Sequence, residues 1–236
     1  MGNNIKTVVL LAFIGALFMA IGYAIGSTGG LTIGLIIALL FCGYQYWNAD
    51  KLALRASRAT PVTEAQMPQY YAIVRELTQR AGLPMPALYV TPDRQPNAFA
   101  TGRNPEHAAV AVTQGILEIC TWDELKGVLA HELCHVGNRD ILITSIAASL
   151  ALSRSREYEA DRCGAKMLGD GEPLARALSK LETTARQVPM QVRPEMAPLY
   201  IINPLTGRQM ALKNLFSDHP PTQDRIARLR SREWAR

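Results

Sequence analysis

The chain has 236 residues, of which 48% are hydrophobic and 19% charged, and its formal net charge is +5. This composition is ample for a folded core, and the length fits one ordinary domain with a smaller addition. Because no aromatic-rich basic sheet or helix-turn-helix pattern accompanies the positive charge, we expect no nucleic-acid partner.

Two uncharged apolar segments lie near the N-terminal end, TVVLLAFIGALFMAIGYAI over residues 7–25 and LTIGLIIALLFCGYQYW over residues 31–47. As helices they would extend roughly 25 to 28 Å, close to the ~30 Å thickness of the hydrocarbon layer. We therefore predict a transmembrane hairpin anchor over residues 1–50, with a short uncharged turn over residues 26–30. A signal peptide is the alternative for the first segment, but its apolar run is long for one and a second run follows directly.

Positive charges flank this hairpin on both sides. Lys6 precedes the first segment, and Lys51, Arg55 and Arg58 follow the second. The positive-inside rule then places both ends of the hairpin in the cytoplasm. We therefore predict a multi-pass membrane protein, with the lipid bilayer as a partner, both termini cytoplasmic and residues 51–236 forming a cytoplasmic domain.

The chain has four cysteines, Cys42, Cys120, Cys134 and Cys163, and none of them forms a CxxC pair. A cytosolic domain keeps its thiols reduced, so we predict no disulfide framework. Cys134 could be proposed as a sulfur ligand of a metal, but packing as a small apolar residue is the interpretation that we favour.

Two capping-box patterns predict helices in the cytoplasmic part. Thr63 with Gln66 predicts a helix over residues 63–81, and Thr121 with Glu124 predicts one that ends at Gly137 and Asn138. Further helices are expected over about residues 141–168, 172–186 and 220–233.

Short segments rich in Ala, Val and Thr separate the first two of these helices. Residues 87–91, 98–101 and 108–113 are punctuated by Pro, Gly and Asn, and they predict a small sheet of two or three strands. The predicted fold class is therefore α+β and mainly helical, with an N-terminal two-helix transmembrane hairpin followed by a domain that contains a small β-sheet.

His131 and His135 lie four residues apart in the segment LAHELCHVGNRD. Each residue of a helix turns about 100°, so the two rings lie only about 40° apart and can converge on one point, as zinc ligands must. Glu132 projects to the side of the pair, where it could accept a proton from a metal-activated water. The alternative is a pair of histidines satisfied by hydrogen bonds; with only four histidines in the chain, a chance HExxH is rare, and we favour the metal site.

A zinc hydrolase uses three protein ligands and leaves the fourth position to water, so a further ligand is needed. The segment SRSREYEAD offers Glu157 and Asp161 on one helical face, and spacing alone leaves Glu159 as a competitor of Glu157. Asp161 could hydrogen-bond the free ring nitrogen of a ligating histidine and so fix its tautomer.

Four motifs in order, HELCH, SRSREYEAD, NAFATGRNPEHAAVAVTQGIL and DHPPTQDRI, make this chain resemble the HtpX family of membrane-bound zinc endopeptidases, which are related to the CAAX prenyl proteases. The resemblance covers nearly the whole chain, hairpin included. It implies a zincin-type metalloprotease domain of the gluzincin type with one Zn²⁺ per chain, Glu157 rather than Glu159 as third ligand, and Glu132 as general base. It also implies a location in a bacterial-type inner (plasma) membrane and polypeptide substrates, namely damaged or misfolded membrane proteins removed in quality control.

The resemblance also implies a strand that binds substrate. AAVAVT would be an edge strand, to which an extended peptide adds its backbone, although an ordinary core strand is the alternative. The expected substrate-binding residues are Ala109, Val110, Ala111 and Val112.

Two residues near the C-terminal end have both a functional and a structural interpretation, and one more histidine has a structural one only. His219 matches a family histidine near the reaction centre, where a donor could stabilise an oxyanion; by itself it would be a loop residue or a helix cap. Arg225 matches a family position that pairs with a site carboxylate, although an arginine on a helix is commonly solvated. His107 is expected at the surface or at the end of the sheet.

The chain departs from the family between its two metal motifs. HtpX proteins usually carry a second hydrophobic hairpin there, whereas only residues 136–156 separate His135 from Glu157. The apolar run ILITSIAASLAL would reach only about 18 Å as a helix, which is too short to cross a bilayer. We therefore predict two membrane spans rather than four.

Two other functions compete with a membrane-anchored zinc endopeptidase. A non-catalytic adaptor would keep zinc as a structural element and bind unfolded clients at its sheet edge, but a structural site has no need of Glu132. A CAAX-type protease that cuts prenylated tails is less favoured, because two spans leave little room for an intramembrane chamber.

Overall fold

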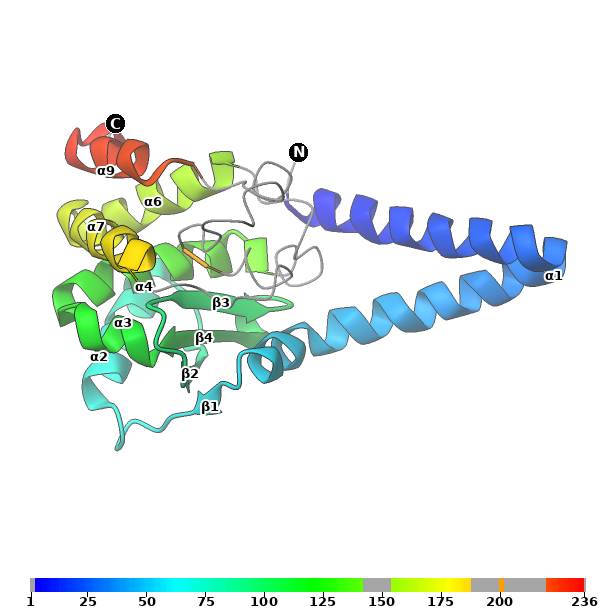
Figure 1. The fold of residues 1–236 in the computed structure, drawn as a ribbon, viewed down its shortest axis with the longest axis horizontal. Helices are drawn as coiled ribbons and strands as arrows, with labels where there is room; N and C mark the ends of the chain where they lie inside the picture. Colours follow the sequence, from blue (N-terminus) through cyan, green and yellow to red (C-terminus); the bar gives the residue numbers. More distant parts are fainter. Residues whose placement is uncertain (1–2, 142–153, 188–199, 202–219, 236) are drawn as a thin grey trace.

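The structure is a computed structural model that describes residues 3–141, 154–187, 200–201 and 220–235. A long N-terminal helix, α1 (Asn3–Ala56), projects from a globular part built of a small sheet and several helices (Figure 1). The chain is thus mainly helical with one four-stranded sheet, and the predicted α+β fold is confirmed.

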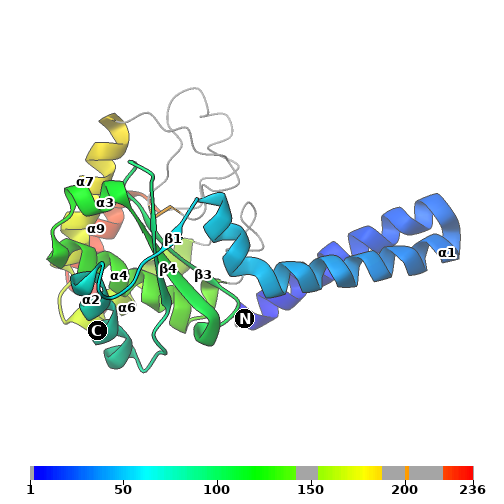
Figure 2. The ribbon, with the colours of Figure 1, turned by 90° about the horizontal axis from the view of Figure 1, so that it is seen from below.

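Helix α1 is bent into two arms near its middle. Gly26 and Ser27 leave the helical conformation, with φ of 51° at Ser27, so the bend forms at the start of the predicted turn. The arms fold back on each other, and the N-terminal end returns toward the globular part (Figures 1 and 2). A Cβ added at Gly22 would lie 2.2 Å from the carbonyl oxygen of Gly30, so only glycine permits this approach. By length and apolar composition, one helix among the described residues could cross a membrane, over Leu11–Asn48.

The sheet contains four strands in the order β1-β2-β4-β3. β2 and β4 are parallel, whereas β1 is antiparallel to β2 and β3 is antiparallel to β4. The strands span β1 (Thr60–Pro61), β2 (Ala87–Thr91), β3 (Ala98–Gly102) and β4 (Ala108–Thr113).

The prediction that AAVAVT is an edge strand is wrong. β4 lies between β2 and β3, and Val110 has Leu88 as its partner on one side and Ala100 on the other. All six residues of β4 are buried, which is what a nearly continuous apolar strand in a sheet covered on both faces requires. Among the described strands, β3 is the one at the edge on this side.

The helices of the globular part are α2 (Pro68–Ala81), α3 (Gln114–Ile119), α4 (Trp122–Gly137), α6 (Arg154–Leu168), α7 (Glu172–Gln187) and α9 (Thr222–Arg230), with short 3-10 turns η1 (Pro105–His107) and η4 (Glu233–Ala235). α4 is central, because it contacts β3 on one side and both α6 and α7 on the other. α9 closes the far side over α6 and α7 (Figure 1).

The two faces of the sheet pack against different parts of the chain. Alternate residues of β3 and β4, such as Ala100 and Val110, join the main core under α4. Phe99 and Ala111 point the other way, and together with Leu54 of α1 they form a second cluster. The end of α1 is therefore attached to the sheet by apolar packing.

Several helix limits differ from the predictions. α2 begins at Pro68 rather than at Thr63, because the residue before a proline avoids the helical region. Thr63 and Gln66 close a turn instead, in which the Thr63 N–H donates to Oε1 of Gln66 over 2.8 Å. The capping box of Thr121 is confirmed at the start of α4. α3 was not predicted, and residues 142–153 of the predicted helix over 141–168 lie outside the described part.

A disulfide joins Cys134 of α4 to Cys163 of α6, so the prediction that no cysteines pair is wrong. The two residues are 29 positions apart in sequence, but the helices cross and bring their Cα atoms to 6.0 Å, a distance that a disulfide spans. Sequence spacing alone cannot reveal a pair made by two crossing helices. Cys42 and Cys120 are free thiols.

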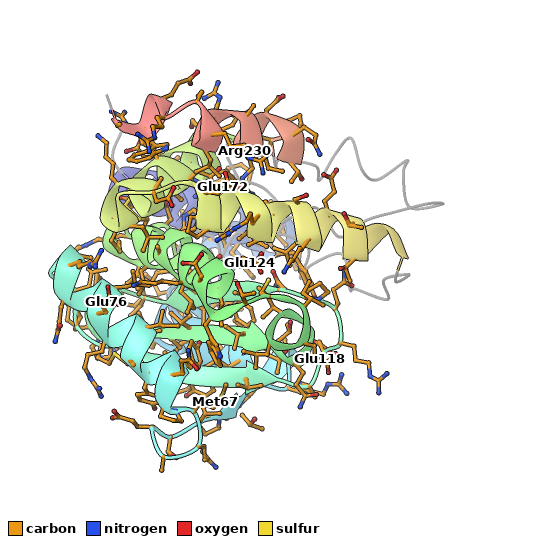
Figure 3. All side chains as sticks on the ribbon, turned by 90° about the vertical axis from the view of Figure 1, so that its left-hand side faces the viewer. Met67, Glu76, Glu118, Glu124, Glu172 and Arg230 are labelled. Atoms are coloured by element: carbon orange, nitrogen blue, oxygen red, sulfur yellow. A yellow bond between two sulfur atoms is a disulfide. The ribbon has the colours of Figure 1, made fainter. Side chains whose placement is uncertain are left out.

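The C-terminal helix is held by both apolar and ionic contacts. Ile226, Leu229 and Trp234 are buried in the main core. On the outer side, Glu172 of α7 lies beside Arg230 of α9 (Figure 3), with an ion pair of 3.1 Å between them. This tail is therefore part of the folded domain.

Candidate metal centre

Helix α4 brings the two histidines of HELCH onto one face. Its start is fixed by the Thr121 capping box, and most of its length is buried between the sheet, α6 and α7. The Nε2 atoms of His131 and His135 lie 3.2 Å apart, and their rings are nearly perpendicular at 88°. Both rings therefore present the same nitrogen to one point, as the four-residue spacing predicts.

Glu157 of α6 faces these two nitrogens. Its Oε2 lies 3.7 Å from Nε2 of His131, and its Oε1 lies 3.6 Å from Nε2 of His135. One ligand atom from each of these three residues lies within 4.8 Å of the others, and the group could hold a metal ion. Glu159 is exposed and lines, with Arg162, a groove that has neither histidine in its lining.

The donor set fits a tetrahedral ion such as zinc. Two ligand atoms that each lie about 2.0 to 2.1 Å from a tetrahedral ion are separated by about 3.3 Å. The distances of 3.2, 3.6 and 3.7 Å between the Nε2 atoms and the carboxylate oxygens are close to that value. Three ligands on two helices leave one tetrahedral position for water or substrate.

Asp161 and Arg225 support His131 from behind. Nδ1 of His131 lies 2.9 Å from Oδ1 of Asp161, the residue that we expect to fix the histidine tautomer. Arg225 of α9 donates two hydrogen bonds to Asp161, of 2.7 and 2.8 Å, and one to the Ile201 carbonyl oxygen. Burial would raise the pKa of Asp161, but the charge and hydrogen bonds of Arg225 outweigh it and lower that pKa.

Arg225 also lies close to the candidate ligand itself. Its Nη1 is 3.7 Å from Oε2 of Glu157, and the side chain is 1% exposed. Arg225 was expected to pair with one site carboxylate, and it lies close to two, those of Asp161 and Glu157. A solvated arginine is excluded at this position.

Asp140 supports His135, and the sequence analysis missed it. Its Oδ2 lies 3.1 Å from Nδ1 of His135, and Nη1 of Arg156 is 3.9 Å from its other oxygen. Burial would lower the pKa of His135, but this hydrogen bond and the charges of Glu157 and Glu132 raise it to about 9. The surroundings therefore favour a positive charge at this point. The available signal was a carboxylate five residues after His135, directly past the helix end.

Glu132 is buried and connects α4 to the sheet. Its Oε2 accepts a hydrogen bond of 3.0 Å from the backbone N–H of Ala100 on β3. Burial raises the pKa of Glu132, and the charge of Glu157 adds to this, although the two histidines and the Ala100 hydrogen bond oppose it. A carboxylate with a raised proton affinity is suited to accept a proton and to return it.

The remaining predicted residues lie elsewhere. Ala109, Val110, Ala111 and Val112 are on β4, one strand removed from the sheet edge. His107 is exposed on η1, at the end of the sheet, as expected. His219 lies outside the described residues.

Comparisons with known proteins agree with this arrangement. The chain matches the sequence model of peptidase family M48 over residues 64–151 and 142–233. It is 43% identical to a protease HtpX homolog of Pelotomaculum thermopropionicum over 277 positions, covering 96% of this chain and 98% of that protein. A homolog of Syntrophobacter fumaroxidans is 44% identical over 283 positions, covering 98% of this chain and all of that protein.

Among solved structures, the crystal structure of S. mikatae Ste24p is similar, with a TM-score of 0.55 and 16% sequence identity. The match covers 96% of this chain but only 65% of that one. At this level of identity the likeness concerns the fold alone.

The alignments also locate a difference in length. They run over 277 and 283 positions although this chain has 236 residues, so the relatives contain residues without a counterpart here. The two stretches that match the family model share residues 142–151, which lie between α4 and α6. This is the place at which the sequence analysis expects a hairpin to be missing.

Proposed function

Because the chain belongs to peptidase family M48, among the HtpX homologs, we propose that it is a membrane-anchored, zinc-dependent endopeptidase. The single observation that carries the proposal is the geometry around α4. One ligand atom from each of His131, His135 and Glu157 lies within 4.8 Å of the others, while Glu132, next to His131 on α4, accepts a hydrogen bond from the backbone of Ala100 on β3. A structural metal site would have no use for a buried carboxylate in this position.

Zinc is the metal that we propose. Two imidazole nitrogens and one carboxylate oxygen suit a borderline-soft ion, whereas magnesium and calcium prefer oxygen ligands throughout. When bound, such an ion would act as a Lewis acid toward water and toward the scissile carbonyl.

The chain's own residues supply the proton transfers and the orientation. Glu132 accepts the proton of the attacking water and returns it to the leaving amine nitrogen. Asp161 and Asp140 hold the two imidazoles through Nδ1, so that both Nε2 atoms stay directed at the ligand position. His219 remains our proposed donor to the oxyanion, on the strength of the DHPPTQDRI motif alone.

We propose β3, rather than the originally expected Ala109–Val112, as the strand that binds substrate. β3 is at the sheet edge, and its residue Ala100 contacts Glu132 through the backbone. An extended peptide that adds to this edge would run past the general base. Recognition through backbone atoms tolerates varied side chains, which suits a protease that acts on damaged proteins.

We further propose that the two arms of α1 cross the bilayer as a hairpin, residues 1–50 serving as anchor and residues 51–236 as a cytoplasmic protease domain. The bend at Gly26 and Ser27 and the positive charges after residue 50 support this arrangement. Arg103, just past β3, lies 4.8 Å from the ring of Trp47 at the end of the second arm. The proposed substrate strand would thus end beside the membrane surface, so misfolded membrane proteins are the proposed substrates.

The test of this function is the Glu132→Gln variant of the full-length protein in detergent. It should keep its zinc but lose hydrolysis of a casein-like substrate by at least about 100-fold, because only the base is removed. Glu118→Gln is the control, since Glu118 is exposed on α3 far from the site. Hydrolysis by Glu132→Gln at the parent rate would refute the assignment of the base.

A further inference from the structure

The Cys134–Cys163 disulfide joins the two helices that carry the candidate metal ligands. Cys134 directly precedes His135 on α4, and Cys163 lies on α6, which carries the carboxylate ligand. At the same crossing, a Cβ added at Gly164 would lie 3.0 Å from the backbone nitrogen of His131. The bond is therefore located where the backbones of the two helices approach each other, beside the ligands.

The same bond spans the part of the chain in which we expect the family's second hydrophobic hairpin to be missing. The overlap of the two family matches, at residues 142–151, falls between the two cysteines, which are 29 positions apart. The relatives contain residues without a counterpart here, and in this chain a covalent bond joins the two helices that flank the overlap.

From these two observations we infer that Cys134 and Cys163 form a positioning cross-link, which holds α6 on α4 and thereby sets the affinity of the site for its metal ion. The inference rests on the proposed metal site. In the bonded form, one ligand atom from each of the three ligands already lies within 4.8 Å of the others. Ligands held in place lose less conformational freedom when an ion binds, so the bond favours binding.

A soluble reductant can reach the bond from the side of Cys163. Both cysteines line a groove of about 600 Å³, and of the two Cys163 is half-buried whereas Cys134 is buried. A thiolate of a dithiol reductant attacks Sγ of Cys163, and Sγ of Cys134 leaves and takes up a proton. The second thiol of the reductant then releases Cys163 as a thiol and closes the reductant's own disulfide. Two electrons and two protons thus pass from the dithiol to the protein.

The cytosol supplies such dithiols, and cytosolic disulfides are usually redox-sensitive rather than permanent. The cross-link therefore makes metal retention depend on the thiol–disulfide balance around the protein. Reduction loosens the contact between the helices without removing any ligand.

The test compares the metal affinity of the full-length protein in detergent with the bond formed and with the bond broken. Oxidised glutathione forms the bond, a phosphine free of thiols breaks it, and competition with a chromophoric chelator measures zinc binding. We expect the zinc Kd to rise about tenfold on reduction, as when a residue that orients a metal ligand is lost. The Cys134→Ala/Cys163→Ala variant should bind zinc like the reduced parent and should not respond to the phosphine.

The matched control removes the two free thiols instead. The Cys42→Ala/Cys120→Ala variant should keep the full response to reduction, since neither residue is in the bond. Equal zinc affinity in both redox states would overturn the cross-link while leaving the metal site intact. Alkylation of oxidised protein, unfolded without reductant, should label two cysteines. Labelling of all four would also overturn the cross-link. If neither form binds zinc, the proposed function fails as well.

Discussion

The two histidines of α4 are held by different parts of the molecule. His131 is supported by Asp161, which is bound in turn by Arg225 of the C-terminal helix, and all three side chains are buried. His135 is supported by Asp140, which lies only three residues past the end of its own helix. One support is a long-range link between helices, and the other is local.

Asp161 and Asp140 each fix an imidazole through Nδ1, but the loss of either contact should affect the stability of the fold to a different extent. The link behind His131 joins α4, α6 and α9, so its loss should affect folding as well as metal binding. The contact behind His135 joins residues that are close in sequence, so its loss should affect mainly the metal. The predictions below separate these two outcomes.

The largest effect is expected at Arg225. Replacing it in Arg225→Leu leaves the carboxylate of Asp161 buried without its cation, which typically costs about 3 to 5 kcal/mol of unfolding free energy. Denaturant unfolding measures this loss. Arg230→Ala is the control on the same helix; its ion pair with Glu172 is exposed, so no measurable change is expected. If Arg225→Leu were as stable as the parent, the contact behind His131 would matter no more for folding than the contact behind His135.

A smaller effect is expected at Asp140. Asp140→Asn keeps the size of the side chain but weakens the charge-assisted hydrogen bond to His135, so the zinc Kd should rise by about 10- to 100-fold. The stability of the metal-free protein at neutral pH should fall far less than in Arg225→Leu. Chelator competition and denaturant unfolding of the same preparation give both numbers. A variant that binds zinc as the parent does would show that His135 needs no support.

The smallest expected effects are those of pH on the stability of the metal-free protein. Rising pH should lower the contribution of His135, whereas falling pH should lower that of Asp161. Although burial opposes it, Asp140, Glu157 and Glu132 raise the pKa of His135 to about 9 from 6.5. The resulting stability is complete below pH 6.5 and is lost as the pH rises through about 9. The Tm of chelator-treated protein should therefore fall over this range, and less so in Asp140→Asn. A flat Tm in the parent would contradict the raised pKa.

On the other side, Arg225 lowers the pKa of Asp161 below its ordinary 3.8 despite burial. The stability that follows is present above pH 3.8 and is lost as the pH falls through the lowered pKa. Acid unfolding of the parent should therefore be steeper than that of Asp161→Asn, which has no carboxylate to protonate. Equal acid sensitivity of the two proteins would argue against the ion pair.

Local patterns predicted those parts of the fold that depend on neighbouring residues. The strands at 87–91 and 108–113 and the capping box at Thr121 follow from sequence alone. The order of the strands does not, because it depends on how β3 returns to pair with β4. The edge position of AAVAVT was expected from the family resemblance alone, and no local pattern could correct it.

In the candidate site too, some residues could be predicted from local sequence patterns and others could not. His131, Glu132 and His135 follow from helical periodicity, whereas the choice of Glu157 over Glu159 needed the resemblance to a known family. The carboxylate of Asp140 was overlooked because it follows the helix stop, and the Cys134–Cys163 bond because it joins two crossing helices. The spacing of residues within one helix does not reveal which residues of another helix it contacts.

The most direct test of the metal centre is the zinc content of full-length protein in which Glu157 or Glu159 is replaced by alanine. We predict that the parent and Glu159→Ala retain one zinc ion per chain after dialysis against a weak chelator, whereas Glu157→Ala retains almost none. Circular dichroism of all three proteins checks that they are folded. Full zinc content in a folded Glu157→Ala variant would contradict the assignment of the three ligands.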